Sequence, residues 1–303
     1  MPVRFNLFLG VIFWGWSFVA TKILLDYVSP VELMGLRFIV GLPVLFGVVL
    51  VKKIKFNFKS KDLQKILIGA LIITIHFLIQ ITGIKYTSAT NTGWIISITP
   101  LVLALLSFII LKEKIGLKEI LGIAVATFGI LLLVSKGNLM NLGWLRSIGD
   151  WLVLASAHTW ALYSVVTRDI SRKYNPLAVT FSILSLSAIA LVTYMLFTSD
   201  WSKFIHLPLE PMMALLFLGI LSLAVAHWFW QEGVSHLGAA RAGFFLYLEP
   251  LATTGLAVPY LHEEFGLFTA IGGMLVLAGV FIAERKTIIK RQTRASAGHN
   301  NLL

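Results

Sequence analysis

The sequence predicts an all-α integral membrane protein with ten transmembrane helices arranged as two inverted five-helix repeats. Three observations lead to this fold class: the composition, the number of apolar stretches and an internal repeat. Of the 303 residues, 58% are hydrophobic and 13% are charged, and the mean hydropathy is +0.88. A water-soluble fold of this length could not bury so much apolar surface. The absence of cysteine excludes disulfide frameworks, cysteine zinc sites and thiolate catalysis.

Apolar stretches long enough to cross a membrane recur along the whole chain. The hydrocarbon core of a bilayer, about 30 Å thick, needs roughly 17 to 25 helical residues. Backbone groups in lipid must hydrogen-bond internally, which favours helices here. The first stretch is a retained helix rather than a signal peptide, because only Arg4 precedes it and no small-residue cleavage site comes before Lys22. The ten stretches lie at approximately 5–25, 32–51, 64–84, 87–111, 116–135, 150–168, 176–198, 211–231, 240–261 and 265–284.

The distribution of charge predicts the orientation. Lysine and arginine outnumber aspartate and glutamate by 25 to 14, a net charge of +11. With ten spans and an inner N-terminus, most of these cations fall on one side, in 52–65, 112–118, 168–173 and 285–294 among other segments. By the positive-inside rule this side is the cytoplasm, which predicts a multi-pass protein of the inner (plasma) membrane with both termini cytoplasmic. The basic excess is therefore a topology signal, and no nucleic-acid partner is expected.

The chain also repeats itself. An odd number of helices per half turns the second half upside down relative to the first, and exchanging the conformations of two such halves alternates access between the two sides of the membrane. The predicted units are 5–135 and 149–285, followed by a basic cytoplasmic tail at 286–303 near anionic headgroups. The aligned pairs are Gly83 with Gly233, Ala89 with Ala239, Gly93 with Gly243, Pro100 with Pro250, Glu113 with Glu263, Gly122 with Gly272, Gly129 with Gly279, Trp14 with Trp160, Thr21 with Thr167 and Lys22 with Arg168.

Short motifs mark both halves, and the second half repeats those at the close of the first. They are WGWSF at 14–18, SP at 29–30, LRF at 36–38, YTSA at 86–89, TPL at 99–101 and KE at 112–113, then HLGAA at 236–240, LEPL at 248–251 and Glu263. This set resembles the EamA repeat of the drug/metabolite transporter superfamily over nearly the whole chain. The resemblance implies a ten-helix inner-membrane carrier whose central cavity is lined mainly by the first, third, fourth, sixth, eighth and ninth helices. It also implies that Glu113 and Glu263 cap helices or dock loops. Members of the superfamily export amino acids, other metabolites or toxic compounds.

Two symmetry-related stripes are the first candidates for substrate binding. Trp14 and Ser17 share one helical face, with Thr21 one turn further, and Trp160 and Tyr163 share the corresponding face of the sixth helix. Carriers built from inverted repeats bind substrate near the midplane. Because both tryptophans lie near mid-span, we expect the stripes to line a cavity. The alternative is that the aromatic residues anchor at the interface and the hydroxyl residues pack helices.

Further polar candidates lie inside the spans. His76 with Gln80, and His227 with Gln231, share the i, i+4 spacing, which places each pair either along a wet cavity or in hydrogen bonds between helices. These spacings form no metal site, because glutamine is a poor ligand and no carboxylate is placed to support it. For the lone His158 the alternative is a hydrogen bond to a nearby carbonyl. The remaining candidates for substrate binding are Asn91, Trp94 and Tyr247.

Prolines and charges inside the spans complete the candidate site. Pro100 and Pro250 each remove a backbone donor, and they are either hinges between moving halves or static packing kinks. Glu249 is either a carboxyl for proton coupling or for a substrate amine, or a residue that reaches the interface or pairs inside the protein. Arg37 is either a structural partner for a carboxylate or carbonyl, or a direct substrate contact.

Three classes of function compete for this sequence. A secondary transporter, in the first place an exporter of amino acids or related small metabolites, accounts for the repeat and the stripes, and a multidrug or toxic-compound exporter fits the aromatic lining nearly as well. An intramembrane enzyme would need a nucleophile with its base, a metal cluster or a carboxylate pair, and the sequence has no such motif. A non-transporting scaffold leaves the stripes without a purpose. We expect a small-molecule substrate, membrane lipid as partner, a monomer, no cofactor, no metal and no ATP-binding P-loop.

Overall fold

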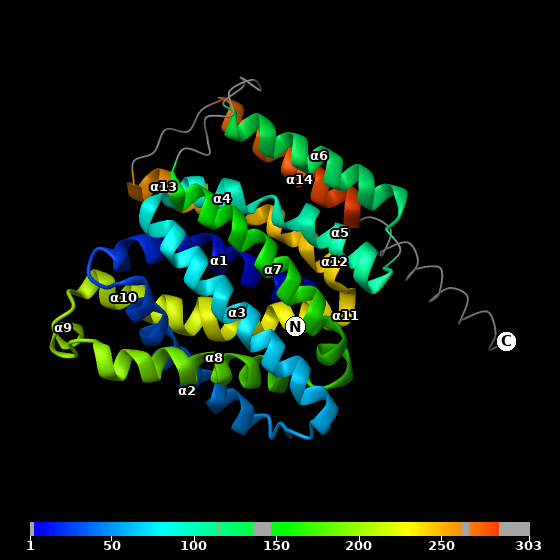
Figure 1. Ribbon diagram of the computed structural model, residues 1–303. Helices are drawn as coiled ribbons and strands as arrows, with labels where there is room; N and C mark the ends of the chain where they lie inside the picture. The colour runs from blue at the N-terminus through cyan, green and yellow to red at the C-terminus, as the bar shows by residue number, and fades with distance from the viewer. Residues whose placement is uncertain (1–2, 114, 136–146, 262–266, 285–303) are drawn as a thin grey trace.

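The computed structural model describes residues 3–113, 115–135, 147–261 and 267–284, and this part of the chain is helical with no strand (Figure 1). Six helical runs have the length and hydropathy of a membrane span: Val3–Leu25, Pro30–Val51, Ser60–Tyr86, Ala89–Leu111, Pro176–Thr198 and Leu209–Leu237. The prediction of an all-helical membrane protein is thereby confirmed, whereas the total of ten spans and their inverted repeat stay predictions. Glu263 and the tail at 286–303 lie outside the described residues.

The elements follow one another along the chain with short connections. They are α1 (Val3–Leu25), α2 (Pro30–Val51), α3 (Ser60–Tyr86), α4 (Ala89–Ile96), α5 (Thr99–Leu111), α6 (Leu117–Val134), α7 (Ile148–Lys173), α8 (Pro176–Thr198), α9 (Ser202–Ile205), α10 (Leu209–Phe217), the π-helical turn η1 (Leu218–Val225), α11 (Ala226–Leu237), α12 (Ala239–Gly243), the 3-10 turn η2 (Phe244–Leu248), α13 (Glu249–Leu261) and α14 (Leu267–Glu284).

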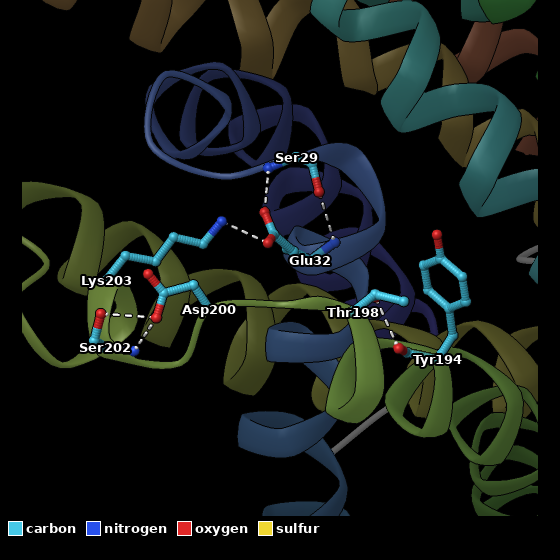
Figure 2. Close-up of polar contacts among 7 residues, drawn as sticks. All are labelled: Ser29, Glu32, Tyr194, Thr198, Asp200, Ser202 and Lys203. Carbon is cyan, nitrogen blue, oxygen red and sulfur yellow. Dashed lines mark hydrogen bonds and ion pairs between the residues drawn. The ribbon is translucent and has the colours of Figure 1, made fainter.

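Polar side chains begin several helices at points that the sequence marks. Ser29 and Glu32 form a reciprocal capping box at the start of α2, with the Ser29 N–H donating to the Glu32 carboxylate over 2.8 Å. Lys203 of α9 pairs with the same carboxylate at 2.5 Å, so the segment after α8 is tied to α2 (Figure 2). In that segment the Ser202 hydroxyl and backbone N–H donate to Asp200 and hold the pKa of its carboxyl below the ordinary value.

Three of the predicted spans are interrupted near their middle. The stretch 87–111 divides into α4 and α5 just before Pro100, and the stretch 240–261 changes to a 3-10 turn just before Pro250. Both prolines therefore stand in the first turn of a new helix, where a missing N–H costs no hydrogen bond. The third interruption is the π-helical turn η1, and turns of this kind occur frequently at functional sites.

Glycines let α6 and α14 pack against each other, and the two helices lie side by side in Figure 1. A Cβ at Gly129 would lie 2.7 Å from the Gly272 carbonyl oxygen, and a Cβ at Gly279 would lie 2.6 Å from the Gly122 carbonyl oxygen. Small residues permit this approach of backbones in membranes. Neither helix contributes a residue to the central cavity described below.

We expect Gly279→Ala to lower the thermal stability of the protein in detergent. The new methyl group would meet the backbone at Gly122 and at Ala126, 2.6 and 2.7 Å away, and overpacking of this kind costs roughly 1 to 3 kcal/mol. Gly47→Ala in α2 is the matched control, because no atom lies within 4 Å of its added Cβ. Equal melting temperatures for the two variants would contradict the close packing of α6 on α14.

Candidate functional site

The central cavity is enclosed by residues from both halves of the chain. It contains about 500 Å³ of empty space, counted out to its open side. It extends from the middle of the helices toward the end of the bundle at which α1 and α3 terminate, where Thr21 and Ile84 contribute to its wall. The lining residues are Trp14, Ser17, Phe18, Thr21, Arg37, His76, Phe77, Gln80, Ile81, Ile84, Ile96, Thr99, Trp160, Ser222, His227, Leu246 and Glu249.

Four rings form the bottom of this cavity, and we call Trp14, His76, Trp160 and His227 the aromatic floor. The rings of Trp14 and Trp160 meet edge to face, with centroids 4.9 Å apart and planes at 82°. The His76 ring lies 5.1 Å from Trp160, and the His227 ring lies 5.2 Å from Trp14. Edge-to-face contacts at these distances stabilise aromatic pairs beyond the burial of their area. The floor therefore offers a rigid apolar surface with two imidazole edges.

The π-helical turn η1 holds this floor in place through one carbonyl. The Ser222 carbonyl oxygen accepts a hydrogen bond from Trp14 Nε1 at 3.0 Å and lies 3.0 Å from His227 Nδ1. His76 Nδ1 is likewise 3.0 Å from the carbonyl oxygen of Ser156. Because a carbonyl only accepts, Nδ1 carries the proton in both histidines. The hydrogen bond at Nδ1 thus fixes the orientation of each imidazole ring and leaves its Nε2 atom as an acceptor.

Two buried ionisable side chains line the same cavity without forming an ion pair. Arg37 is 4% exposed and Glu249 is 5% exposed. The Arg37 guanidinium donates from Nη2 to Ser222 Oγ at 3.2 Å and lies 5.4 Å above the Phe77 ring. The Glu249 carboxyl has no hydrogen bond or ion pair with any residue that the structure describes. A charge at bilayer depth costs about 2.5 to 3.5 kcal/mol on insertion scales unless it is paired or wet.

Close packing of α1 on α13 fixes the position of Glu249. Gly15 approaches so closely that a Cβ there would lie 2.7 Å from the Glu249 carbonyl oxygen. The Thr253 hydroxyl lies 2.9 Å from the carbonyl oxygens of Gly15 and of Glu249. The carboxyl therefore projects into the cavity from a rigid junction between the first and the last third of the chain.

The structure brings together six of the eleven predicted binding residues and, with them, the proton-coupling candidate Glu249. Trp14, Ser17, His76, Gln80, Trp160, His227 and Glu249 line the cavity. Thr21 lines it as well, one turn beyond Ser17, as the stripe on α1 predicts.

The other five predicted binding residues lie outside the lining. Asn91 donates to Asp150 over 2.6 Å, and Trp94 packs beside a second apolar cluster around Ile123 and Val276. His158 is exposed and bonds the Leu154 carbonyl of its own helix over 2.9 Å. The remaining two are Tyr163, which is buried below Trp160, and Tyr247, whose hydroxyl lies 3.1 Å from Thr127 Oγ1.

A buried hydrogen-bond network separates the floor from the opposite end of the bundle. Gln231 donates to the Tyr163 hydroxyl over 2.6 Å and to Thr167 Oγ1 over 3.2 Å, and it accepts from Ser171 at 2.8 Å. His227 and Gln231 therefore do not form one wet strip, since only His227 reaches the cavity. Because the polar groups of this network are hydrogen-bonded to one another, the described helices are joined without a cavity below the aromatic floor.

Ion pairs join the helices at the end of the bundle beyond that network, and we call this end of the bundle the closed end. Glu113, which follows α5, lies 3.1 Å from the Arg168 guanidinium of α7, and its other oxygen accepts from the Ala240 N–H at 3.3 Å. Arg241 lies 3.8 Å from Glu119 of α6. The structure thus supports the predicted docking role of Glu113. These contacts join α5 and α6 to α7 and α12, so the cavity continues toward one end of the bundle only.

Sequence reasoning gave no weight to Ser222, which anchors Trp14, His227 and Arg37. Its role depends on the π-helical turn, and the segment LGILSLAV carries no recognised signal for such a turn. The role of Phe77 beneath Arg37 could not be recognised from the sequence either, because an apolar residue in an apolar span has no distinguishing feature. From the sequence alone, the glycine and the serine of η1 would have predicted only a site of helix packing.

A helical membrane protein with a polar and aromatic cavity at its centre has the architecture of a solute transporter. The sequence model of the EamA-like transporter family matches residues 3–135 and again residues 147–284. The chain therefore belongs to the EamA-like transporter family and is a transporter rather than an enzyme, which confirms the resemblance drawn from its motifs.

Curated relatives and a solved structure resemble the chain over most of its length. An uncharacterized transporter of Bacillus subtilis, YyaM, is 28% identical over 90% of both chains, and one of Archaeoglobus fulgidus is 28% identical over 92% of this chain and 96% of its own. A protein of Streptantibioticus cattleyicolor described as a probable terminal-alkyne amino-acid exporter is 25% identical over 79% of each. A solved crystal structure matches 93% of this chain and 98% of its own with a TM-score of 0.75 at 19% identity, which shows a shared fold.

Proposed function

We propose that this transporter exports amino acids or related small metabolites across the plasma membrane by alternating access. The observation that carries the proposal is the central cavity, whose floor is aromatic, whose wall holds buried polar and charged groups, and whose far side is closed. The similarity to the probable terminal-alkyne amino-acid exporter of Streptantibioticus cattleyicolor favours an amino-acid cargo over a drug. A multidrug exporter is the second candidate, because the aromatic floor would also accept flat apolar compounds.

Ten spans in two inverted repeats fit this proposal. The chain supplies ten helical units once the interrupted runs are joined: α1, α2, α3, α4 with α5, α6, α7, α8, α10 through α11, α12 through α13, and α14. The two segments that match the family, 3–135 and 147–284, would each hold five of them. In this arrangement Pro100 and Pro250 stand at equivalent junctions, where each proline removes one backbone donor between two short helices, and they serve as hinges.

The structure corresponds to an outward-facing state in this proposal. The positive-inside rule places the closed end, with Arg168 and Arg241, at the cytoplasm. The cavity then faces the outside, and export requires the contacts of Glu113 and the Gln231 network to open toward the cytoplasm. Glu249 would couple this cycle to protons, because a carboxyl in the cavity wall can release a proton to one side and accept one from the other.

We expect Glu113→Gln to open the closed end more often. The change removes the charge that Arg168 faces but preserves an acceptor for the Ala240 N–H. A partly exposed pair of this kind is worth about 1 kcal/mol, roughly a fivefold change in the population of the open state. The reporter is Ser171→Cys, because the chain has no cysteine of its own and Ser171 is buried in the network. Its labelling by a membrane-impermeant maleimide from the cytoplasmic side should accelerate by that factor.

A control variant separates the bridge between helices from the charge of Arg168. Asp169 also pairs with Arg168, at 2.6 Å, but it is the next residue on the same helix. Asp169→Asn should therefore leave the labelling rate of Ser171→Cys unchanged. Equal rates in the Glu113→Gln and parent backgrounds would show that this contact does not hold the end closed.

Counterflow in liposomes tests the proposed function itself. Purified protein is reconstituted, loaded with an unlabelled compound and challenged with the labelled one, using a panel of amino acids, nucleobases and cationic dyes. The proposal predicts exchange of amino acids above the level of protein-free liposomes. Exchange of dyes without amino acids would favour the multidrug alternative, and exchange of no compound under any ion gradient would contradict transport through this chain.

A further inference from the structure

Arg37 and Glu249 are two separate ionisable side chains in the lining of one cavity, a potential cation and a potential anion with no ion pair between them, and we propose that they bind the two ends of a zwitterion. Arg37 would hold the carboxylate and Glu249 the ammonium group of an α-amino acid, and the side chain of the substrate would rest on the aromatic floor. This inference rests on the proposed function and sharpens it, because it states which part of the cargo each wall recognises.

The Arg37 guanidinium is positioned to bind an anion, because the described residues use only one of its hydrogen-bond donors. It has five N–H donors, and its single hydrogen bond to a described residue runs from Nη2 to Ser222 Oγ at 3.2 Å. Nε is buried without a partner, and no carboxylate of the described residues lies within ion-pair distance. Ser222 and the Phe77 ring hold the guanidinium plane in place. A planar fork of this kind matches the two oxygens of a carboxylate.

Glu249 offers the complementary group on α13. An ionised carboxylate only accepts hydrogen bonds, and no described residue donates to this one. Neither oxygen is fully enclosed, and both are accessible from the cavity that Glu249 lines. An ammonium group, with three donors and a positive charge, satisfies it directly. When the ammonium leaves, a proton can take its place, which agrees with the proton coupling proposed above.

The pair of charges discriminates between classes of cargo. A zwitterion neutralises both residues and adds no net charge to the cavity. A cationic amine or dye would leave Arg37 without a counter-charge, and a carboxylate without an amine would leave Glu249 without one. An unpaired buried charge is unfavourable in this environment. The cavity should therefore prefer a molecule that carries both groups over analogues that carry one.

The floor adds a preference for the side chain. Trp14 and Trp160 present their rings between the two charged residues and the closed end, and the indole N–H of Trp160 donates to no described residue. An apolar or aromatic side chain buries its area on these rings. Phenylalanine is thus the natural test compound, since its derivatives alter one charge at a time without changing the ring.

The experiment compares four compounds in counterflow with the reconstituted protein: phenylalanine, N-acetylphenylalanine, phenylalanine amide and phenethylamine. Each loss of a charge-assisted contact should weaken competition against labelled phenylalanine by about 10- to 100-fold. Equal competition by the amide and the zwitterion in the wild-type protein would overturn the role of Arg37, and equal competition by the N-acetyl compound would overturn that of Glu249. If no compound exchanges, the proposed function fails first and this inference with it.

Variants assign each charge to its end of the substrate. In Arg37→Gln the amide should compete as well as phenylalanine, and in Glu249→Gln the N-acetyl compound should do so. Lys203→Gln, a cation on α9 away from the cavity, should preserve the wild-type order of all four compounds. A uniform loss of affinity for all four in Arg37→Gln would indicate a purely structural arginine. The wild-type series decides the matter even if this variant does not fold.

Discussion

Replacing Glu249 by glutamine is expected to remove the acceleration of export by an inward proton gradient. Glutamine preserves the size and one acceptor of the side chain, but it neither ionises nor binds a proton. In reconstituted wild-type protein, an acidic exterior should drive efflux of labelled phenylalanine from the cytoplasmic side. In Glu249→Gln that gradient-driven component should fall by about tenfold or more, the equivalent of at least one lost charge-assisted hydrogen bond, while exchange without a gradient continues with the reduced selectivity described above.

The other titratable and charged groups of the cavity define the control. Beside Arg37 from α2, whose guanidinium is not a proton carrier, the cavity holds His76 from α3 and His227 from α11 as competing proton carriers. Persistence of the gradient effect in Glu249→Gln would transfer the coupling to these histidines. Glu210→Gln provides the matched carboxyl, because Glu210 bonds Tyr260 at an exposed position and does not line the central cavity. It should behave as the wild-type protein does.

Trp160→Ala is expected to abolish transport and to destabilise the protein. The Trp160 ring contacts Trp14, His76, Tyr163 and His227 at centroid distances from 4.9 to 5.6 Å. Removing so large a buried ring typically costs 3 to roughly 5 kcal/mol, and the floor that supports the substrate would collapse into the space. The measurement pairs thermal unfolding in detergent with counterflow in liposomes at a temperature where the variant remains folded.

Two further variants separate stability from function. Trp151 lies on the same helix but is 55% exposed, so Trp151→Ala should affect neither the melting temperature nor transport to a comparable degree. Trp160→Phe preserves an aromatic ring and should recover most of the stability and part of the transport. Normal transport by folded Trp160→Ala would show that the floor plays no part in carrying substrate.

The sequence predicted the helical membrane class of this fold because the causes of that class are local. Apolar length marks the spans, and Pro100 and Pro250 were expected to disturb their helices, as they do where a new helix begins. The capping boxes of Ser29 with Glu32 and of Ser147 with Asp150, which were not predicted, are local signals of the same kind. Each of these signals acts within a few residues and needs no knowledge of neighbouring helices.

The candidate site was predictable only in part, because a cavity depends on how helices face one another. The stripe of Trp14, Ser17 and Thr21 lies on one wall, as spacing predicts. Its counterpart on α7 divides, since Trp160 reaches the cavity whereas Tyr163 turns into the network below it. The i, i+4 pair of His227 and Gln231 also divides, because the two residues lie one turn apart along α11: His227 reaches the cavity, whereas Gln231 lies in the network below the floor.

The central claim is that cargo moves through this cavity, and Gln80→Cys tests it most directly. Gln80 of α3 lines the cavity, and the chain has no other cysteine. The account predicts that a membrane-impermeant thiol reagent added outside labels this cysteine, that labelling blocks counterflow of phenylalanine, and that phenylalanine present during the reaction protects it. Full labelling with undiminished counterflow, or labelling at the same rate with and without phenylalanine, would contradict the account.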